Sequence, residues 1–147
     1  MKKKIALTCS LFFLAPTAQA LLLTNKTGSD IIMVEASSFV IENDKISDLK
    51  AGAKIKRIKK NGVINIIPNQ EFCIVYRNKL FCHYFGRTIR KKRGGKSIIL
   101  SLGYMITERL KVISFMPTPL GPFPVPEGSM TKVDCPEEVI IKLQKSK

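Results

Sequence analysis

Short apolar runs, each bounded by turn-forming residues, recur along most of this 147-residue chain. The runs are rich in Ile and Val, and they return about every 8 to 12 residues with Gly, Asn, Asp or Pro between them. That spacing is typical of consecutive antiparallel strands and leaves little room for long helices. The sequence therefore predicts an all-β fold, an antiparallel β-sandwich or barrel of about 7 strands built from successive hairpins.

Three hairpins can be placed from their turn residues. Asn61-Gly62 is the strongest signal, because both residues tolerate the positive φ of a two-residue hairpin turn. Arg77-Asn78 and Gly94-Gly95 mark two further turns. The flanking strands are then expected at residues 54–60 and 63–67, 72–76 and 79–85, and 87–93 and 96–102.

The rest of the chain towards the C-terminus has a different character. Residues 104–115 are predicted as one further strand with a bulge, and a helix over residues 108–114 is the alternative. Residues 116–126 hold five prolines, which predicts an extended, polyproline-like segment near the C-terminus. Residues 139–143 are β-branched and apolar and favour one last edge strand. We therefore expect a β-sandwich domain over residues 21–116, followed by a Pro-rich segment and tail over residues 117–147.

Residues 1–20 have the layout of a secretory signal peptide. Three lysines precede an apolar stretch of about ten residues, and Ala18 and Ala20 supply the small residues that a signal peptidase needs. Cleavage is expected after Ala20, and a lipoprotein box at Cys9 fits poorly because too few apolar residues precede that cysteine. The apolar stretch is too short to span a bilayer, and no other run is long enough. The sequence predicts an exported protein, periplasmic or secreted, with no transmembrane span in its mature form.

Positive charge is the most pronounced feature of the composition. The formal net charge is +14, and removal of residues 1–20, which hold three lysines and no acidic residue, lowers it to +11. The cations gather around two of the predicted turns. The first group precedes Asn61-Gly62 and begins with Lys50 and Lys54, and the second group surrounds Gly94-Gly95. The candidate anion-binding residues are Lys56, Arg57, Lys59 and Lys60 in the first group and Arg87, Arg90, Lys91, Lys92, Arg93 and Lys96 in the second.

These two groups suggest a partner with many negative groups. Export argues against nucleic acid, and it favours an anionic glycan, lipopolysaccharide or a phospholipid surface. The competing interpretation is that lysines on edge strands only prevent edge-to-edge aggregation and raise solubility. An envelope protein is a further possible partner.

Three cysteines remain after the predicted cleavage. If Arg77-Asn78 is a two-residue turn, Cys73 faces Cys82 in a non-hydrogen-bonded pair, whose short Cα separation suits a disulfide. A longer turn would separate the two, and a bridge from Cys135 to one of them is then the alternative. In either case one thiol is left over, and Cys135 is predicted to be free or intermolecular.

Catalytic and metal-binding patterns are weak in this sequence. Cys73, Cys82 and His83 have no standard zinc spacing, and Cys82 and His83 are expected on opposite faces of a strand. No nucleophile elbow or phosphate-binding loop is present. We therefore expect no cofactor, no metal and no enzymatic activity. The sequence favours a non-catalytic binding module that contacts an anionic envelope or host surface through its cationic hairpins. The alternative is a structural or assembly component of a bacterial cell-envelope or secretion complex.

Overall fold

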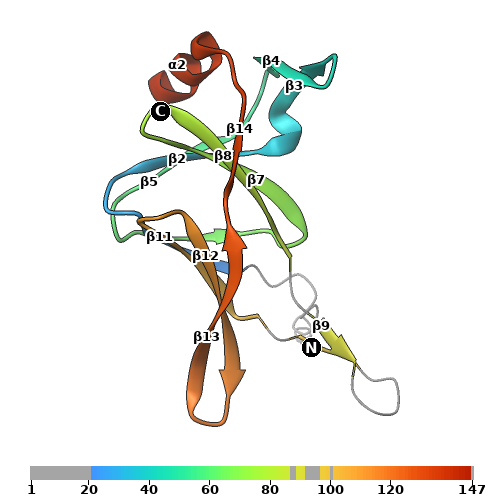
Figure 1. Cartoon of the computed structure of the whole chain (residues 1–147), viewed down its shortest axis with the longest axis vertical. Coiled ribbons are helices and arrows are strands. Elements are labelled where there is room, and N and C mark those ends of the chain that lie inside the picture. The colour runs from blue at the N-terminus through green and yellow to red at the C-terminus, as the bar shows by residue number, and fades with distance from the viewer. Residues whose placement is uncertain (1–20, 87–88, 92–96, 100, 147) are drawn as a thin grey trace, which may run out of the picture.

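The computed structural model of the chain describes residues 21–86, 89–91, 97–99 and 101–146. These residues form two five-stranded sheets that pack face to face, so the predicted all-β, sandwich-like fold is confirmed (Figure 1). Sheet I has the order β13 (Gly121–Ser129), β12 (Lys111–Thr118), β11 (Gly103–Thr107), β1 (Leu21–Lys26), β6 (Val63–Ile66). Sheet II has the order β14 (Thr131–Val133), β8 (Lys79–Phe85), β7 (Gln70–Tyr76), β2 (Ile31–Glu35), β5 (Ile55–Ile58). The remaining elements are the 3-10 turn η2 (Ala36–Ser38), the pairs β3 (Phe39–Glu42) with β4 (Lys45–Leu49) and β9 (Ile89–Lys91) with β10 (Ser97–Ile99), and the helix α2 (Glu137–Lys145).

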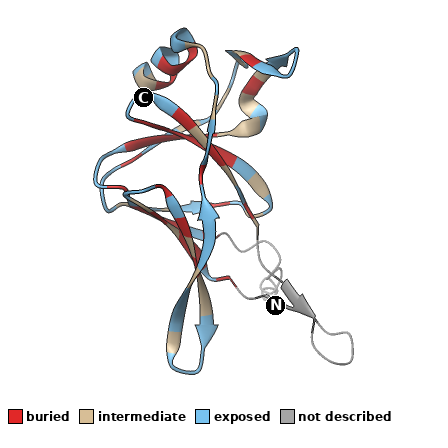
Figure 2. Ribbon diagram, in the orientation of Figure 1, coloured by how far each residue is buried: buried red, intermediate tan, exposed pale blue. Residues whose placement is uncertain are grey.

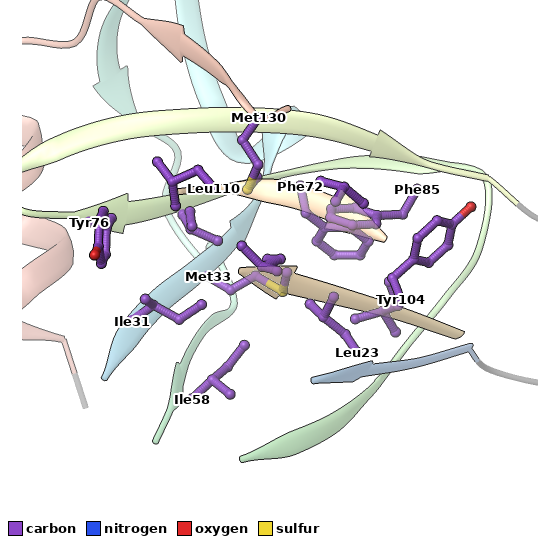
Figure 3. Close-up of a cluster of buried hydrophobic side chains, with 14 of the residues drawn as sticks. Leu23, Ile31, Met33, Ile58, Phe72, Tyr76, Phe85, Tyr104, Leu110 and Met130 are labelled. Atoms are coloured by element: carbon purple, nitrogen blue, oxygen red, sulfur yellow. The ribbon is translucent and has the colours of Figure 1, made fainter. Parts of the chain in front are cut away.

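The inner core fills the space between the two sheets (Figure 3). It contains every second side chain of β1, Leu21 and Leu23, which are fully buried, while Leu22 between them is exposed. Aromatic rings close one side, where Phe85 lies edge-on to Tyr104 with 5.1 Å between ring centroids. The hydroxyl of Tyr104 donates a hydrogen bond to the carbonyl of Gly86. This alternation of buried and exposed residues is the pattern of a sheet with one covered face.

Sheet II is also covered on its outer face. An outer core contains Val34, Val75 and Leu80 of the sheet together with Val139 and Leu143 of α2. The β3–β4 hairpin covers the same face, and Figure 2 shows buried residues on both of these covering elements. Sheet II is therefore buried on both sides.

The β7–β8 hairpin confirms the predicted two-residue turn and its register. Arg77 and Asn78 both have positive φ, at 53° and 62°. Tyr76 pairs with Lys79, and the register continues from there to the pair Cys73 and Cys82. The Cα atoms of these cysteines are 4.0 Å apart and their sulfurs are bonded, so the predicted disulfide is confirmed.

The hairpin predicted around Asn61-Gly62 is wrong. Asn61 does have positive φ, at 62°, but β5 before the turn pairs with β2 in sheet II, and β6 after it pairs with β1 in sheet I. The turn is a corner between the sheets, and the fully buried Asn25 holds it. The Asn25 side-chain amide donates to the carbonyls of Ile58 and Lys59, each at 3.1 Å, while its backbone N donates to the Gly62 carbonyl at 2.9 Å. The corner is thus bonded to β1, and it is closed internally by the backbone N of Gly62, which donates to the Lys59 carbonyl at 2.7 Å.

The single strand predicted over residues 104–115 is also wrong, because the structure has a hairpin there. β11 and β12 pair antiparallel, and Leu110 turns the chain with a φ of 61°. The backbone N of Leu110 donates to the Thr107 carbonyl at 2.9 Å, and that of Lys111 donates to the Thr107 hydroxyl at 3.1 Å. A leucine in the left-handed region is rare, so the sequence carried no signal for this turn. The expected irregularity is present, as a register shift between Val112 and Ile113 in the pairing of β12 with β13.

The last edge strand predicted at residues 139–143 is a helix. Val139, Ile140 and Leu143 are buried at helical spacing, and Lys142 and Lys145 lie in the last turn, where the helix dipole favours cations. Burial against sheet II outweighs the strand propensity of the β-branched residues. The tail does contain an edge strand, but it is β14, which pairs with β8. The Pro-rich segment, residues 116–126, is extended in two pieces joined by a turn, since residues 116–118 end β12 and pair antiparallel with the first residues of β13.

Sheet I contains one parallel pair, β1 with β11, in an otherwise antiparallel arrangement. β9 and β10 pair antiparallel, as expected for the hairpin around Gly94-Gly95, whose connecting residues 92–96 lie outside the described residues. The predicted signal peptide, residues 1–20, also lies outside them. Within the part of the chain that the structure describes, no helix reaches the length and hydropathy of a membrane span.

Candidate anion-binding edge

The first basic segment of the sequence forms a free edge of sheet II. β5 pairs with β2 on one side, and among the described residues no strand pairs with its other side. Six cations on β5 and beside it are exposed: Lys50, Lys54, Lys56, Arg57, Lys59 and Lys60. We call this set the basic edge. All four of the predicted anion-binding residues in the first group belong to it.

Alternation along β5 divides the basic edge between two faces. Ile58 is buried in the inner core, so Lys56 lies on the face towards sheet I. Ile55 packs against the outer core, so Arg57 lies on the face towards α2. The Arg57 guanidinium donates to the Gln144 carbonyl at 3.4 Å, at the C-terminal turn of α2 where a cation is favourable. Arg57 is thus partly engaged by the helix, whereas Lys56 points to the opening between the sheets.

Little negative charge offsets the basic edge. Residues 50–62 hold its six cations and no acidic residue. Within the described ranges the one salt bridge joins Lys142 to Asp48, so no member of the edge forms an ion pair there. Asp30 lies beside Lys60, but it accepts a hydrogen bond from the backbone N of Lys60 at 2.8 Å, which holds the corner. The ammonium groups therefore remain available to an external anion.

A pocket of about 160 Å³ opens between the sheets beside the basic edge. Lys54 and Lys56 line it together with Glu35 and the apolar side chains of β2, β6 and β7. Gln70 also lines it, and its Oε1 atom is buried with no hydrogen-bond partner among the described residues. A buried acceptor without a donor is costly, so a ligand hydroxyl or amide at this point is favourable. The pocket can hold a small group that carries both a hydrogen-bond donor and a negative charge.

The second basic segment is described only in part. Arg90 and Lys91 lie on β9, for which the structure gives the backbone pairing with β10. Lys91 is placed opposite Ser97, and Arg90 opposite Ile98. The other predicted anion-binding residues of this group, Arg87, Lys92, Arg93 and Lys96, lie outside the described residues or have no described side chain.

A further group of cations was missed by sequence reasoning. Arg77 and Lys79 at the β7–β8 turn and Arg109 at the β11–β12 turn line one pocket of about 280 Å³, together with Glu108. The Arg77 guanidinium lies over the Tyr76 ring, 5.1 Å from its centroid. These residues are some 30 positions apart in the chain and meet only because the two turns lie at the same end of the sandwich. Gln70 and Glu35 were also missed, because neither stands in a basic run and only the fold brings them beside Lys54 and Lys56.

The third cysteine is not bonded to the other two. Cys135 is free and half-buried, and it packs against the outer core. Burial raises the pKa of the Cys135 thiol, which keeps it protonated and poorly nucleophilic at neutral pH. Its predicted role in an intermolecular bond stays a prediction.

His83 and the cysteine beside it lie on opposite faces of β8. Cys82 belongs to the outer core, whereas the His83 ring contacts Phe85 of the inner core, with 5.0 Å between ring centroids. Burial lowers the pKa of His83, more than the Ser129 backbone and the Glu71 charge raise it. Among the described residues no three His, Cys, Asp or Glu side chains gather as metal ligands would. The absence of enzymatic activity and of a cofactor remains an expectation from the sequence.

No protein-family model, no curated protein and no solved structure matches this chain.

Proposed function

We propose that this protein is an exported, non-catalytic binding module that contacts an anionic envelope or host surface through the basic edge. The observation that carries the proposal is the row of six exposed cations on and beside a free edge strand, with no acidic residue in the same segment. Lysines that only blocked aggregation would need no pocket beside them, yet Lys54 and Lys56 line one. The shared chemistry of the partner is a set of closely spaced phosphate, sulfate or carboxylate groups.

The rigidity of the edge supports this function. β5 is fixed by its ladder with β2, and the corner after it is held by the hydrogen bonds of Asn25. Because this backbone is already ordered, binding to a row of anions requires little further loss of backbone conformational entropy. Its attraction reaches about one Debye length, roughly 8 Å at physiological ionic strength, so binding should weaken steeply with added salt.

The test compares two sets of three substitutions that lower the net charge equally. In the first, Lys56→Gln, Lys59→Gln and Lys60→Gln remove cations from the basic edge. In the second, the control, Lys45→Gln, Lys111→Gln and Lys132→Gln remove exposed cations elsewhere. Retention is measured on immobilised heparin, on lipopolysaccharide and on vesicles of phosphatidylcholine and phosphatidylglycerol in equal parts, which separates glycan from lipid partners.

Each cation near an anionic surface contributes about 1 kcal/mol, so the first set should lose about a hundredfold in affinity at low salt. The control set should lose much less. Equal losses would show that only the net charge matters, and retention unchanged by the first set would refute the proposal. The second basic segment is tested in the same way by Arg90→Ser, Lys91→Ser, Lys92→Ser and Arg93→Ser.

A further inference from the structure

The β12–β13 hairpin reaches well beyond the rest of sheet I. β11 pairs with β12 only as far as Phe115, opposite Gly103. The later residues of β12 pair with β13 alone, so the end of the hairpin is a two-stranded ribbon that projects from the sandwich (Figure 1). We call residues 116–126 the arm.

The arm is apolar and uncharged, in a chain whose net charge is +14. Leu120 at its tip is fully exposed, and Phe123 is 59% exposed. In Figure 2 the arm carries exposed and half-buried residues throughout, in contrast to the sandwich. Large apolar side chains at the tip of a projecting element are typical of a surface that meets another apolar phase.

The prolines of the arm settle which backbone groups point outwards. Pro117 pairs with Pro122, and because neither has an N–H, this pair is not hydrogen-bonded. Hydrogen-bonded and non-hydrogen-bonded pairs alternate in an antiparallel ladder. The bonded pairs are therefore the intervening ones, Thr118 with Gly121, Met116 with Phe123, and Ser114 with Val125.

Every outward-facing position of the arm is consequently a proline. On β13 these are residues 122, 124 and 126, and on β12 beyond its pairing with β11 it is residue 117. At the tip, the backbone N of Leu120 donates to the Thr118 hydroxyl at 3.2 Å. The arm therefore presents no free N–H group on either edge, although outward carbonyls remain.

A ribbon without free N–H groups suits an apolar environment and does not suit strand addition. Each unpaired N–H donor in hydrocarbon is unfavourable by several kcal/mol, and the arm has no such donor on its edges. Adding a strand needs both N–H donors and carbonyl acceptors along the edge that it joins, and neither edge of the arm has the donors, so a second copy or a partner strand has little to bond with. The remaining carbonyls can accept hydrogen bonds from water at the headgroup level.

We propose that the arm inserts into the outer part of an anionic lipid bilayer. Insertion buries Leu120 and Phe123 among acyl chains, while cations elsewhere on the protein meet the headgroups. Arg90 and Lys91 are carried by β9, which lies at the same end of the molecule as the arm (Figure 1). Insertion rests on the proposed function in one respect, namely that cations bring the protein to a negatively charged surface. That surface is here a lipid bilayer.

Because the chain has no tryptophan, a single introduced tryptophan reports on the arm alone. In Leu120→Trp the emission should shift to shorter wavelength, and brominated lipids should quench it, when vesicles of phosphatidylcholine and phosphatidylglycerol in equal parts are added. The matched control is Ile41→Trp, at a site on β3 that is 56% exposed, and its emission should not change. No shift in Leu120→Trp with bound vesicles would overturn the proposal.

A second pair of variants separates insertion from charge. Leu120→Ser with Phe123→Ser should lower partition into these vesicles about tenfold or more while heparin retention stays unchanged. Leu22→Ser with Ile41→Ser, which removes two other exposed apolar side chains, should leave both unchanged. Binding to heparin but never to vesicles would refute insertion and leave the proposed function standing, whereas binding to neither would refute both. A tryptophan shift seen only with envelope protein, and not with lipid, would assign the arm to a protein groove and also overturn insertion.

Discussion

Sheets I and II each have five strands, yet they differ in how many of their faces are covered. In sheet I the strand β1 alternates between buried Leu21 and Leu23 and exposed Leu22. In sheet II the strand β7 buries five residues in succession, Phe72 to Tyr76, because the inner core takes one set and the outer core the other. Two strands of similar length thus have different sequence patterns, and the pattern reports the number of covered faces.

The comparison teaches that a continuous apolar run calls for a covering element. The runs Ile31–Val34 and Phe72–Tyr76 are continuous, and β3, β4 and α2 are the elements that cover them. Charge is distributed accordingly, since the described cations of sheet II lie on its two edge strands, β5 and β14, and at the β7–β8 turn. One edge strand of each sheet also differs in composition, since β5 of sheet II carries cations and β13 of sheet I carries prolines.

The largest expected effect is on the free energy of unfolding, when a residue on the outer face of sheet II is compared with one on the outer face of sheet I. Ile32 on β2 and Leu22 on β1 both point away from the inner core, but Ile32 is 5% exposed and Leu22 is 50% exposed. Ile32→Ala should lower the free energy of unfolding by about 2–5 kcal/mol, because it opens a cavity under the covering elements. Leu22→Ala should lower it by less than about 1 kcal/mol. Urea unfolding measures both, and equal losses would mean that the outer face of sheet II is not covered.

The disulfide strengthens only sheet II, since it joins β7 to β8. It closes a short loop, and Cys73→Ala with Cys82→Ala should reduce the free energy of unfolding by about 2.5–3 kcal/mol in the loop-entropy model. Cys135→Ala, at the free half-buried thiol, is the control and should change it little. Thermal or urea unfolding under non-reducing conditions provides the measurement. A double variant as stable as the unmodified protein would show that the hairpin needs no bridge.

The smallest effect concerns the ion pair that ties α2 to β4. Lys142 Nζ lies 2.7 Å from Asp48 Oδ1 at the surface. This hydrogen bond, helped by the backbone N of Leu49, lowers the pKa of Asp48. A lowered carboxyl pKa adds stability at neutral pH that is lost as the pH falls through that pKa. In Lys142→Gln the pKa of Asp48 should rise towards its ordinary value in an NMR titration, with almost no change in melting temperature at neutral pH. Lys145→Gln should leave this pKa where it is.

Local features of this fold could be predicted from the sequence, and long-range ones could not. The β7–β8 register followed from counting outwards from Arg77-Asn78, because a two-residue turn fixes the pairing of its own strands. Asn61 also turned the chain as expected, but turn chemistry does not determine which sheet each flanking strand joins, and the buried Asn25 decides that. The helix α2 was missed because Val139 and Ile140 prefer strands, and only the apolar outer face of sheet II makes a helix favourable.

In the candidate site, too, the local features could be predicted from the sequence and the long-range ones could not. The exposure of Lys56 and Lys59 was predictable, since lysines on an edge strand stay in solvent. The pocket was not, because Glu35, Lys54 and Gln70 come from separate parts of the chain and meet only through the pairing of β2 with β5 and β7. Proline spacing in the arm was visible from the start, but its meaning depended on the register with β12.

The central position of β1 sets an order of events during folding. β1 lies between β6 and β11, which follow it by about 40 and 80 residues, and both are needed to complete its ladder. The β7–β8 hairpin needs only residues 70–85 and can form as soon as they are available. In a chain synthesised from its N-terminus, Leu21 and Leu23 are therefore made well before the strands that flank them, and β1 completes its pairing only when β11 is available. The first strand is the segment that stays unpaired longest, so a chaperone that recognises unpaired apolar strands would find its most persistent target there.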